Sequence, residues 1–283
     1  MVIAEIGCNH KGEMEIAKSM IDIAAHYCGA DAVKFQKRNN RELLGDSYDD
    51  PHPCQENSYG SSYGLHRDFL EFDVSQHKQL KKWCEEAGVV YSCSVWDLTS
   101  AHEIASIEPA MIKIPSAKNN HKEMLDWLCR KYPGEIHVSL GMTKRTEEHE
   151  IYDLFHFRER LHDLVLYSCT SGYPVPFEDV CLLEIERLID TYGENVNAMG
   201  FSGHHLGIAV DMAARALGAK YIERHYTLDR TWKGTDHAAS LEPDGLRKLV
   251  RDIRAVDAAL TYRPQEILDI EAVQRDKLKG ATA

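Results

Sequence analysis

Short apolar runs alternate with longer amphipathic stretches along almost the whole chain. The short runs are rich in β-forming residues, whereas the longer stretches repeat their apolar positions with the period of a helix. Eight strands are therefore predicted, over Val2–Gly7, Asp31–Gln36, Val89–Val95, Met111–Pro115, Ile136–Leu140, Leu164–Cys169, Ala198–Ser202 and Tyr221–Tyr226. A helix is predicted after each strand, over Glu13–Tyr27, Ser75–Ala87, Ser100–Ile107, Lys122–Arg130, Glu147–Leu161, Asp179–Thr191, Ile208–Leu217 and Pro243–Leu260.

This regular order of strand and helix determines the expected fold class. Strands that are mostly apolar are typical of a parallel sheet whose faces are covered by helices. An open, doubly wound sheet uses the same elements, but eight successive units favour closure into a barrel. The length of 283 residues also suits such a barrel, which takes roughly 250 residues as one domain. We therefore expect an α/β, single-domain (β/α)8 TIM barrel over residues 1–262.

Two segments fall outside the regular pattern. The stretch Lys37–Arg67 follows the second predicted strand and is rich in Asn, Pro, Gly, Ser and Tyr. Loops of this length inside a compact domain are often lids, so we expect a functional insertion at residues 37–67. Residues 263–283 are polar and charged, and we expect them to form a C-terminal tail that is helical or mobile.

Composition and charge narrow the classes of partner. The formal net charge of −12 argues against a nucleic-acid partner and against an anionic membrane surface. It does not argue against a small anionic ligand, because a few cations in a cleft set the local field. No run approaches the roughly 18 apolar residues of a membrane span. The cysteines form no C-x-x-C pair and no signal-peptide pattern is seen, so we expect a cytoplasmic protein with reduced thiols.

Polar and ionisable residues gather where the predicted strands end. In a barrel of this kind the active site is built from those ends and from the loops that follow them. The residues concerned are Glu5, Asn9, His10, Lys34, Gln36, Ser94, Asp97, Lys113, Ser116, Lys118, Ser171, Tyr173, Ser202, His204, His205, Glu223, Arg224, His225, Asp236 and His237.

Lys34 and Lys113 lie inside predicted strands between apolar neighbours, where a charge is costly unless it is paired. The alternation of side chains along a strand directs both lysines into the barrel. Together with nearby serine hydroxyls they are suited to binding a phosphate or a carboxylate. The alternative is that each lysine simply pairs with a barrel glutamate, such as Glu5 or Glu223, and has a structural role.

His204 and His225 fall at the ends of two adjacent predicted strands. Two imidazoles, a carboxylate and water suit a catalytic divalent metal with open positions. A structural role for these histidines is equally open, because single histidines are more often hydrogen-bonded structural residues. Cys93 and Cys169 also lie near strand ends, and we expect both to pack within the barrel.

The order of motifs resembles the sialic acid synthase family, whose members are phosphoenolpyruvate-dependent enzymes that make nonulosonic acids. The resemblance covers almost the whole chain. It rests on AEIGCNHKG (Ala4–Gly12), GADAVKFQK (Gly29–Lys37), IKIPSA (Ile112–Ala117), SLGM (Ser139–Met142), SCTSGYPVP (Ser168–Pro176), GFSGHH (Gly200–His205), IERHYTLDR (Ile222–Arg230) and GTDHAASLEP (Gly234–Pro243).

This resemblance implies a reaction and a role for each matching position. The family joins phosphoenolpyruvate to the open-chain aldehyde of an N-acylmannosamine-like sugar. By position, His204 and His225 match the ligands of Mn²⁺ or Mg²⁺. Phosphoenolpyruvate would be bound by Lys34, Ser94, Lys113, Ser116, Ser171 and Ser202, and the sugar and the reacting carbons would be lined by Glu5, Gln36, Tyr173, Glu223 and Asp236. We expect the catalytic residues to be Glu5, Lys34, Lys113, Glu223 and Asp236.

The sequence departs from the family pattern in two places. Most relatives continue into a small antifreeze-like domain that helps to close the site, whereas this sequence ends at Ala283. Either it is a truncated form or the site closes by other means, for which Asn57–Tyr63 is a candidate lid. Lys118 stands where many relatives have a carboxylate that contacts the sugar, so it either favours an anionic acceptor or points to solvent.

Two other functions remain open from the sequence. A Schiff-base aldolase or lyase on a similar barrel would use Lys34 or Lys113 as its nucleophile. A barrel that binds a sugar without turnover is also conceivable, since a fold does not determine a function. The buried charges and the histidine pair favour an enzyme. The resemblance also implies a homo-oligomer, a dimer or higher.

Overall fold

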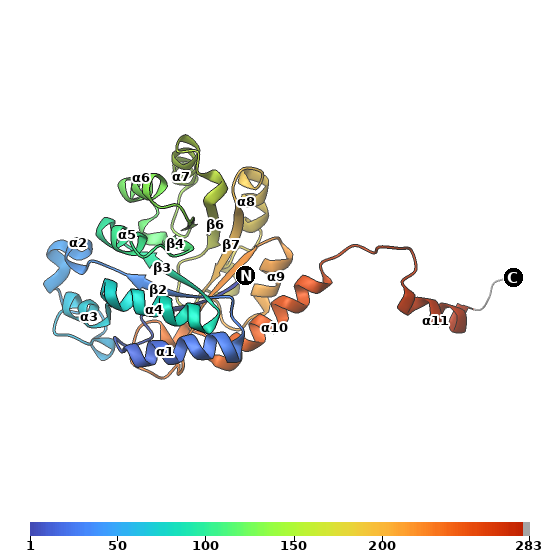
Figure 1. Ribbon diagram of the computed structural model, residues 1–283, viewed down its shortest axis with the longest axis horizontal. Coiled ribbons are helices and arrows are strands. Elements are labelled where there is room, and N and C mark those ends of the chain that lie inside the picture. Colours follow the sequence, from blue (N-terminus) through green and yellow to red (C-terminus); the bar gives the residue numbers. More distant parts are fainter. Residues whose placement is uncertain (280–283) are drawn as a thin grey trace.

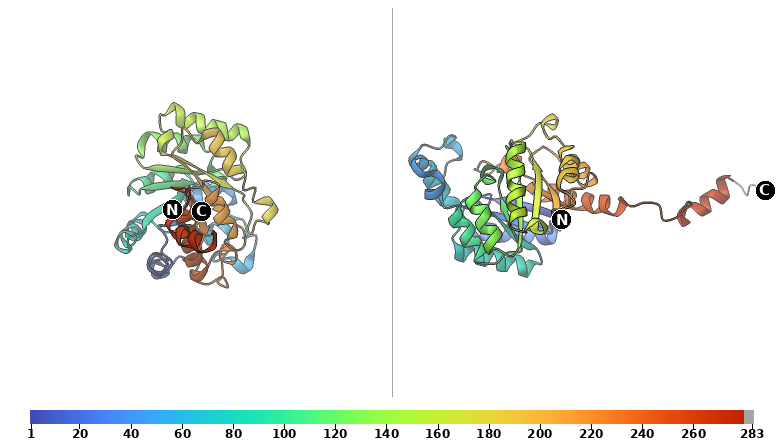
Figure 2. Two further views of the ribbon diagram at one scale, coloured as in Figure 1. Left: turned by 90° about the vertical axis from the view of Figure 1, so that its right-hand side faces the viewer. Right: turned by 90° about the horizontal axis from the view of Figure 1, so that it is seen from above.

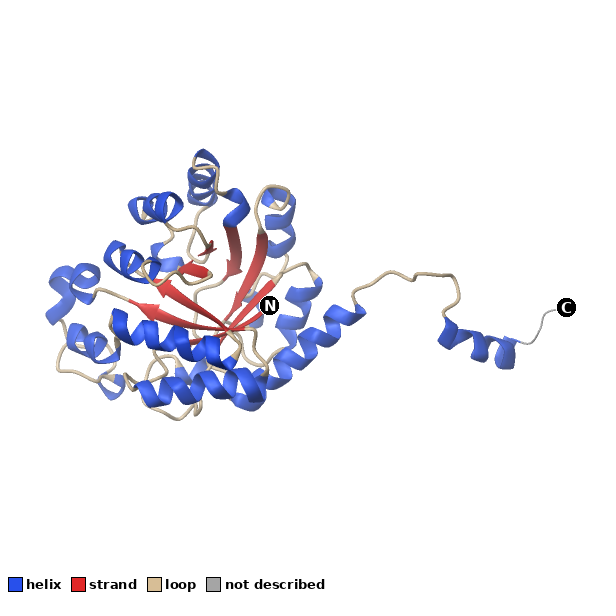
Figure 3. Cartoon of the chain, viewed as in Figure 1, coloured by secondary structure: helices blue, strands red, loops and turns tan. Residues whose placement is uncertain are grey.

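Eight parallel strands close into a barrel in sequence order, with β1 paired to β8 (Figures 1 and 3). The computed structural model describes residues 1–279. The strands in that range are β1 Val2–Gly7, β2 Ala32–Lys37, β3 Val90–Val95, β4 Met111–Ile114, β5 Glu135–Ser139, β6 Leu164–Cys169, β7 Ala198–Gly203 and β8 Tyr221–His225. The expected TIM barrel is therefore confirmed, with strand ends that differ from the predicted ones by at most one residue.

A ring of helices surrounds the strands (Figure 3). It consists of α1 Met14–Asp22, α4 Val74–Ala87, α5 Leu98–Ala105, α6 Lys122–Lys131, α7 Arg145–Phe157, α8 Glu184–Tyr192, α9 Ala209–Ala216 and α10 Pro243–Ala259. The predicted start of α8 at Asp179 is wrong, because a separate helical turn at Phe177–Asp179 precedes it. None of the helices in residues 1–279 has the length and apolar composition that crossing a bilayer requires.

Local sequence signals explain where these helices begin and end, and α4 is an example. Asp73 precedes it and accepts a hydrogen bond from the backbone N–H of Gln76, whose side chain in turn accepts one from the Asp73 N–H. This reciprocal pair satisfies backbone donors that the first turn leaves without partners. The helix ends at Gly88, whose φ of 75° lies in the left-handed region that glycine adopts without strain.

The alternation of side chains along the strands separates an apolar core from a charged interior. Val33 and Phe35, which flank Lys34, belong to the large core between barrel and helices. Lys34 itself points inside the barrel, and the same alternation directs Lys113 inward. The predicted orientation of both lysines is therefore confirmed.

The insertion at residues 37–67 is more ordered than the loop that its composition suggested. It contains α2 Asn40–Leu44 and the beginning of α3 Tyr63–Leu70. Its middle contacts the loop after β8, since Tyr59 Oη donates to the carbonyl of Lys233 at 2.6 Å. The insertion is thus attached to the same face of the barrel as the loop that carries Asp236.

The expected tail is helical in part. The helix α11 Asp269–Lys279 buries none of its residues and lies apart from the barrel (Figure 2). Residues 280–283 of the expected tail lie outside the described residues.

Two buried histidines predict that the protein loses stability in acid. Burial lowers the pKa of both His10 and His77 to about 3, whereas an unfolded histidine has a pKa of about 6.5. Below pH 6.5 the unfolded chain therefore binds more protons than the folded one. The free energy of unfolding should fall as pH drops from about 6.5 toward 3, by up to about 1.4 kcal/mol per pH unit for each histidine.

Urea unfolding followed between about pH 7 and pH 5 measures this slope. The variant His77→Gln removes one of the two groups and should show a shallower slope than the wild type. An identical slope in the two proteins would contradict the assignment for His77.

Candidate active site

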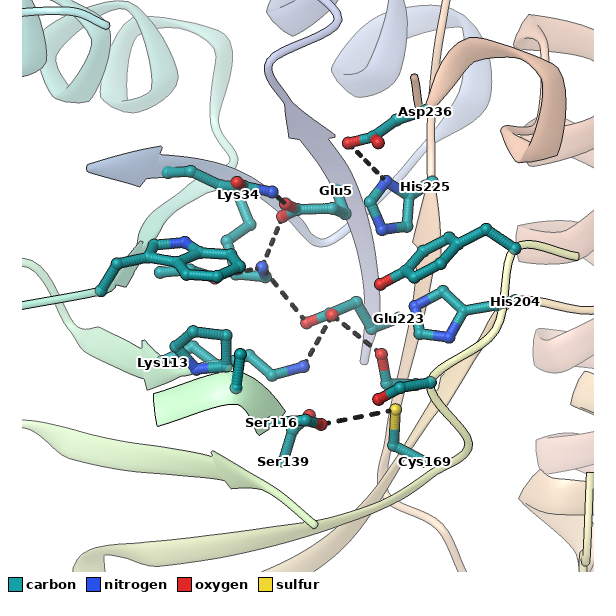
Figure 4. A pocket seen from close by; sticks show the side chains of 18 of the residues that line it. Glu5, Lys34, Lys113, Ser116, Ser139, Cys169, His204, Glu223, His225 and Asp236 are labelled. Atoms are coloured by element: carbon teal, nitrogen blue, oxygen red, sulfur yellow. Dashed lines mark hydrogen bonds and ion pairs between the residues drawn. The ribbon is translucent and has the colours of Figure 1, made fainter. Parts of the chain in front are cut away.

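A cavity of about 370 Å³ opens at the carboxyl ends of the barrel strands. It is lined by Glu5, Lys34, Gln36, Arg38, Arg67, Ser94, Trp96, Lys113, Pro115, Ser116, Ala117, Ser139, Met142, Cys169, Ser171, Tyr173, Ser202, His204, Glu223, His225 and Asp236. Residues from every strand of the barrel, or from the loop after it, thus meet at one place, and Figure 4 shows how ten of them lie.

The carboxylate of Glu223 lies at the centre of the charged groups (Figure 4). Its Oε1 accepts a hydrogen bond from Lys113 Nζ at 2.6 Å and one from Ser202 Oγ at 3.1 Å. Its Oε2 lies 3.7 Å from Lys34 Nζ. A single buried carboxylate therefore holds both barrel lysines, which come from β2 and β4.

Lys34 also binds a second carboxylate. Its Nζ lies 2.5 Å from Glu5 Oε2 and donates to Ser94 Oγ at 2.6 Å. Gln36 Nε2 donates to the other oxygen of Glu5 at 2.6 Å, and Arg38 donates to the amide oxygen of Gln36. The proposed structural pairing of the lysines with barrel glutamates is thus present, and the same groups line the cavity.

The two glutamates differ in their tendency to hold a proton. Burial raises the pKa of Glu5 even though the ammonium of Lys34 acts in the opposite direction. Burial would also raise the pKa of Glu223, but the charges of Lys113 and Lys34 outweigh it and hold that pKa well below its usual range. Glu223 is therefore a permanent anion, whereas Glu5 is the better placed of the two to exchange a proton.

His204 and His225 lie side by side in the cavity wall, with their ring centroids 5.5 Å apart (Figure 4). His204 Nδ1 is 3.0 Å from the carbonyl of Thr170, so Nε2 is the ring nitrogen that remains for a ligand. Among residues 1–279, His225 Nδ1 has no hydrogen-bond partner; it is buried and lies 3.9 Å from Asp236 Oδ2. Tyr173 packs against both rings, at centroid distances of 4.3 and 5.8 Å.

The two imidazoles could contribute to a metal site, but they would need other ligands. Within residues 1–279, no group of three His, Cys, Asp or Glu side chains is close enough to hold an ion. Nε2 of His204 and Nδ1 of His225 nevertheless suit an open site, in which water and substrate would complete the coordination. The donor set therefore fits a divalent metal held by two histidines.

Every residue to which the sequence analysis gave a catalytic, substrate-binding or metal-binding role lines this cavity, except Lys118. Lys118 is half-buried at the end of the helical turn Ser116–Lys118, whose first two residues do line the cavity. Asn9 and Asp97 are structural. Asn9 Nδ2 donates to the carbonyl of Tyr226 at 2.8 Å, and Asp97 accepts from the first turn of α5.

Sequence reasoning did not find several residues of the cavity wall, namely Arg38, Arg67, Trp96, Ser139 and Met142. Cys169 was expected to pack within the barrel, but it lines the cavity and its Sγ accepts from Ser116 Oγ at 3.8 Å. Arg38 follows β2 directly, so its position at a strand end was a signal. Arg67 had none, since it reaches the cavity through the fold of the insertion.

Three comparisons relate the chain to known proteins. The model of the NeuB family matches residues 20–264. N-acetylneuraminate-9-phosphate synthase of Homo sapiens is 36% identical over 282 residues, which cover 98% of this chain and 76% of the human protein. N,N'-diacetyllegionaminic acid synthase of Campylobacter jejuni is 33% identical over 262 residues, or 92% of this chain and 77% of that protein. The crystal structure of N-acetylneuraminic acid synthetase from Leptospira borgpetersenii in complex with citrate has a TM-score of 0.82 and 27% identity, and the match covers 98% of this chain and 92% of that one.

The central position of Glu223 predicts a large loss of stability when its charge is removed. Glu223→Gln leaves the ammonium of Lys113 buried without its counter-ion, which should cost about 3 to 5 kcal/mol. If Lys113 is replaced as well, in Lys113→Met with Glu223→Gln, part of that loss should be recovered. Denaturant unfolding of the two single variants and the double variant measures the coupling, and strictly additive losses would contradict it.

Proposed function

The chain belongs to the NeuB family, and on that basis we propose that it joins phosphoenolpyruvate to the aldehyde of an N-acylmannosamine-like sugar, giving a nonulosonic acid and phosphate. The human and Campylobacter relatives carry the names of synthases that make acids of this kind. The chain covers about three quarters of each of them.

The observation that carries this proposal is the pair of lysines beside a group of serine hydroxyls. Within residues 1–279, Lys113 Nζ has one hydrogen-bond partner, Glu223, so the other ammonium protons are free for a ligand. Glycine at position 141 keeps space for the hydroxyls of Ser116 and Ser171, because a Cβ there would clash with both oxygens. Donors from several strands thus converge on a volume suited to a phosphate and a carboxylate.

The side chains of this cavity define the steps of the proposed reaction. Lys34 and Lys113 hold phosphoenolpyruvate with its C3 toward the aldehyde carbon, which supplies proximity and orientation. The new C–C bond leaves a cationic C2, which the carboxylate of Glu223 stabilises electrostatically. Glu5, with its raised pKa, takes the proton of the water that attacks C2. The C2 hydroxyl then loses its proton to the departing phosphate as the C2–O bond to phosphate breaks, which leaves a ketone, and the former aldehyde oxygen takes the proton held by Glu5.

A divalent metal completes the proposal. His204 and His225 would hold Mn²⁺ or Mg²⁺, which would act as a Lewis acid on the aldehyde oxygen. Asp236 Oδ2 lies 3.9 Å from His225 Nδ1, so its carboxylate would add negative charge beside the ion. Tyr173 covers both rings on one side and limits the access of water to them.

Phosphate release from phosphoenolpyruvate tests the function. We expect release that depends on Mn²⁺ and on one sugar of a panel containing N-acetylmannosamine, its 6-phosphate, mannose and other aldoses, and that stops with EDTA. His204→Ala should abolish turnover and weaken Mn²⁺ binding in equilibrium dialysis, while the circular dichroism of the fold is unchanged. Full activity in this variant would contradict the metal role.

A Schiff-base aldolase is the competing function, because burial lowers the pKa of Lys113 and a neutral amine is the form that attacks a carbonyl. Borohydride trapping with pyruvate distinguishes the two. The aldolase would gain the mass of the reduced adduct, whereas the synthase would not.

The contacts of Arg67 in the cavity wall predict which sugar acceptor the protein favours. Its Nε and one terminal nitrogen donate to Tyr63 Oη at 3.2 and 2.8 Å, and within residues 1–279 it has no carboxylate partner. The other cations of the cavity wall are paired with glutamates. A guanidinium without a counter-ion favours an acceptor that carries its own anionic group, such as a sugar phosphate.

Arg67→Gln should therefore raise the KM for the 6-phosphate of N-acetylmannosamine about tenfold and leave the KM for phosphoenolpyruvate unchanged. Arg67→Lys keeps the charge and should have a smaller effect. Equal changes in KM for the phosphorylated and unphosphorylated sugars would show that Arg67 does not bind the phosphate group of the acceptor.

A further inference from the structure

A column of polar side chains extends from Lys113 toward the opposite end of the barrel. Lys113 Nζ lies 4.1 Å from the centre of the Tyr167 ring. The hydroxyl of Tyr167 is 2.8 Å from His137 Nδ1, and His137 Nε2 is 3.1 Å from Glu135 Oε2. Tyr167 and His137 are fully buried, whereas the Glu135 side chain is 37% exposed. None of the steps proposed above uses these three residues.

The barrel makes room for the ring of Tyr167. Gly200 of β7 is the register partner of Tyr167 in β6. A Cβ at position 200 would lie 2.5 Å from a ring carbon of Tyr167, so any larger residue would displace the ring. The contact between the ring and Lys113 therefore depends on a glycine at this position.

The hydrogen bonds of the column have a definite direction. Burial lowers the pKa of His137, and the hydrogen bond from His137 lowers the pKa of Glu135. A neutral imidazole next to an ionised carboxylate donates its Nε2 proton to that carboxylate. Nδ1 is then the acceptor, and the Tyr167 hydroxyl donates to it.

We propose that Glu135, His137 and Tyr167 act as positioning residues that hold the Lys113 ammonium, in its charged form, against the cavity. The carboxylate makes His137 a stronger acceptor, and His137 in turn draws the Tyr167 proton and enriches the ring in electron density. A cation over an aromatic face is stabilised most when both are removed from water, as they are here.

This column is not a path for protons. Lys113 contacts the face of the ring, whereas His137 contacts the hydroxyl. The chain of hydrogen bonds therefore stops at Tyr167, and its effect on Lys113 is electrostatic. The competing explanation is purely structural, since residues at the amino ends of barrel strands commonly serve stability.

Tyr221 offers a matched control. Its hydroxyl donates to Glu135 Oε2 at 3.0 Å, and its ring packs on His137 with a centroid distance of 4.8 Å. Tyr221→Phe and Tyr167→Phe each remove one hydroxyl from the same network. Of these two tyrosines, Tyr167 is the one whose ring contacts Lys113. A structural role therefore predicts that the two changes affect Lys113 equally, whereas a positioning role predicts a larger effect of Tyr167→Phe.

The first readout concerns Lys113 directly and needs no substrate. A brief pulse of acetic anhydride, followed by peptide mass spectrometry, reports how fast Lys113 is acetylated relative to Lys34. A weaker contact with the ring makes the Lys113 ammonium less stable, and the neutral amine is the form that reacts with the anhydride. Acetylation of Lys113 should therefore be about threefold faster in Tyr167→Phe and about tenfold faster in Tyr167→Leu. Tyr221→Phe should leave it unchanged, and circular dichroism checks that each variant is folded.

The second readout is the affinity for phosphoenolpyruvate, measured by calorimetry, and it rests on the proposed function. We expect affinity to fall about threefold in Tyr167→Phe and to stay constant in Tyr221→Phe. Equal acetylation rates in wild type and both phenylalanine variants would overturn the positioning role. If acetylation responds as expected but the wild type binds no phosphoenolpyruvate, the proposed function fails and the positioning of Lys113 stands.

Discussion

Glu223 accepts hydrogen bonds from Lys113 and Ser202 with one oxygen and faces Lys34 with the other, and its side chain is buried. Each of these charges would be costly alone, and together they neutralise part of one another. The arrangement exists only because a closed barrel brings β2, β4, β7 and β8 around one axis. The same proximity that makes the cluster stable places two ammonium groups in the wall of the cavity.

The charge balance of the cavity gives its parts different chemistry. Glu223 stays ionised because two lysines surround it, whereas Glu5 is paired with one lysine and burial raises its pKa. Two carboxylates on adjacent strands thereby become suited to different tasks, one to stabilising positive charge and one to exchanging a proton. Arg67 adds a positive charge to the cavity wall from the insertion. The ring of Tyr167 contacts the positive charge of Lys113 inside the barrel.

Much of the fold and of the cavity could be predicted from the sequence. Two patterns made this possible: the alternation of side chains along each strand, and the regular succession of strands and helices. Strict alternation around Lys34 and Lys113 predicted inward lysines, and eight βα units predicted strand ends that meet in space. The same reasoning could not find Arg67, whose position depends on how α2 and α3 fold within the insertion. It also missed His137 and Tyr167, because alternation shows that a side chain points inward but not at which end of the barrel it lies.

A crystal structure with phosphoenolpyruvate bound would show directly whether the cluster around Glu223 is the substrate site. We predict that oxygens of the phosphate and carboxylate lie within hydrogen-bond distance of Lys113 and of the hydroxyls of Ser116 and Ser171. The carbon chain of the ligand should extend toward His204 and His225. Phosphoenolpyruvate bound elsewhere, with the Lys113 ammonium making no contact to it, would show that this cluster is not the substrate site.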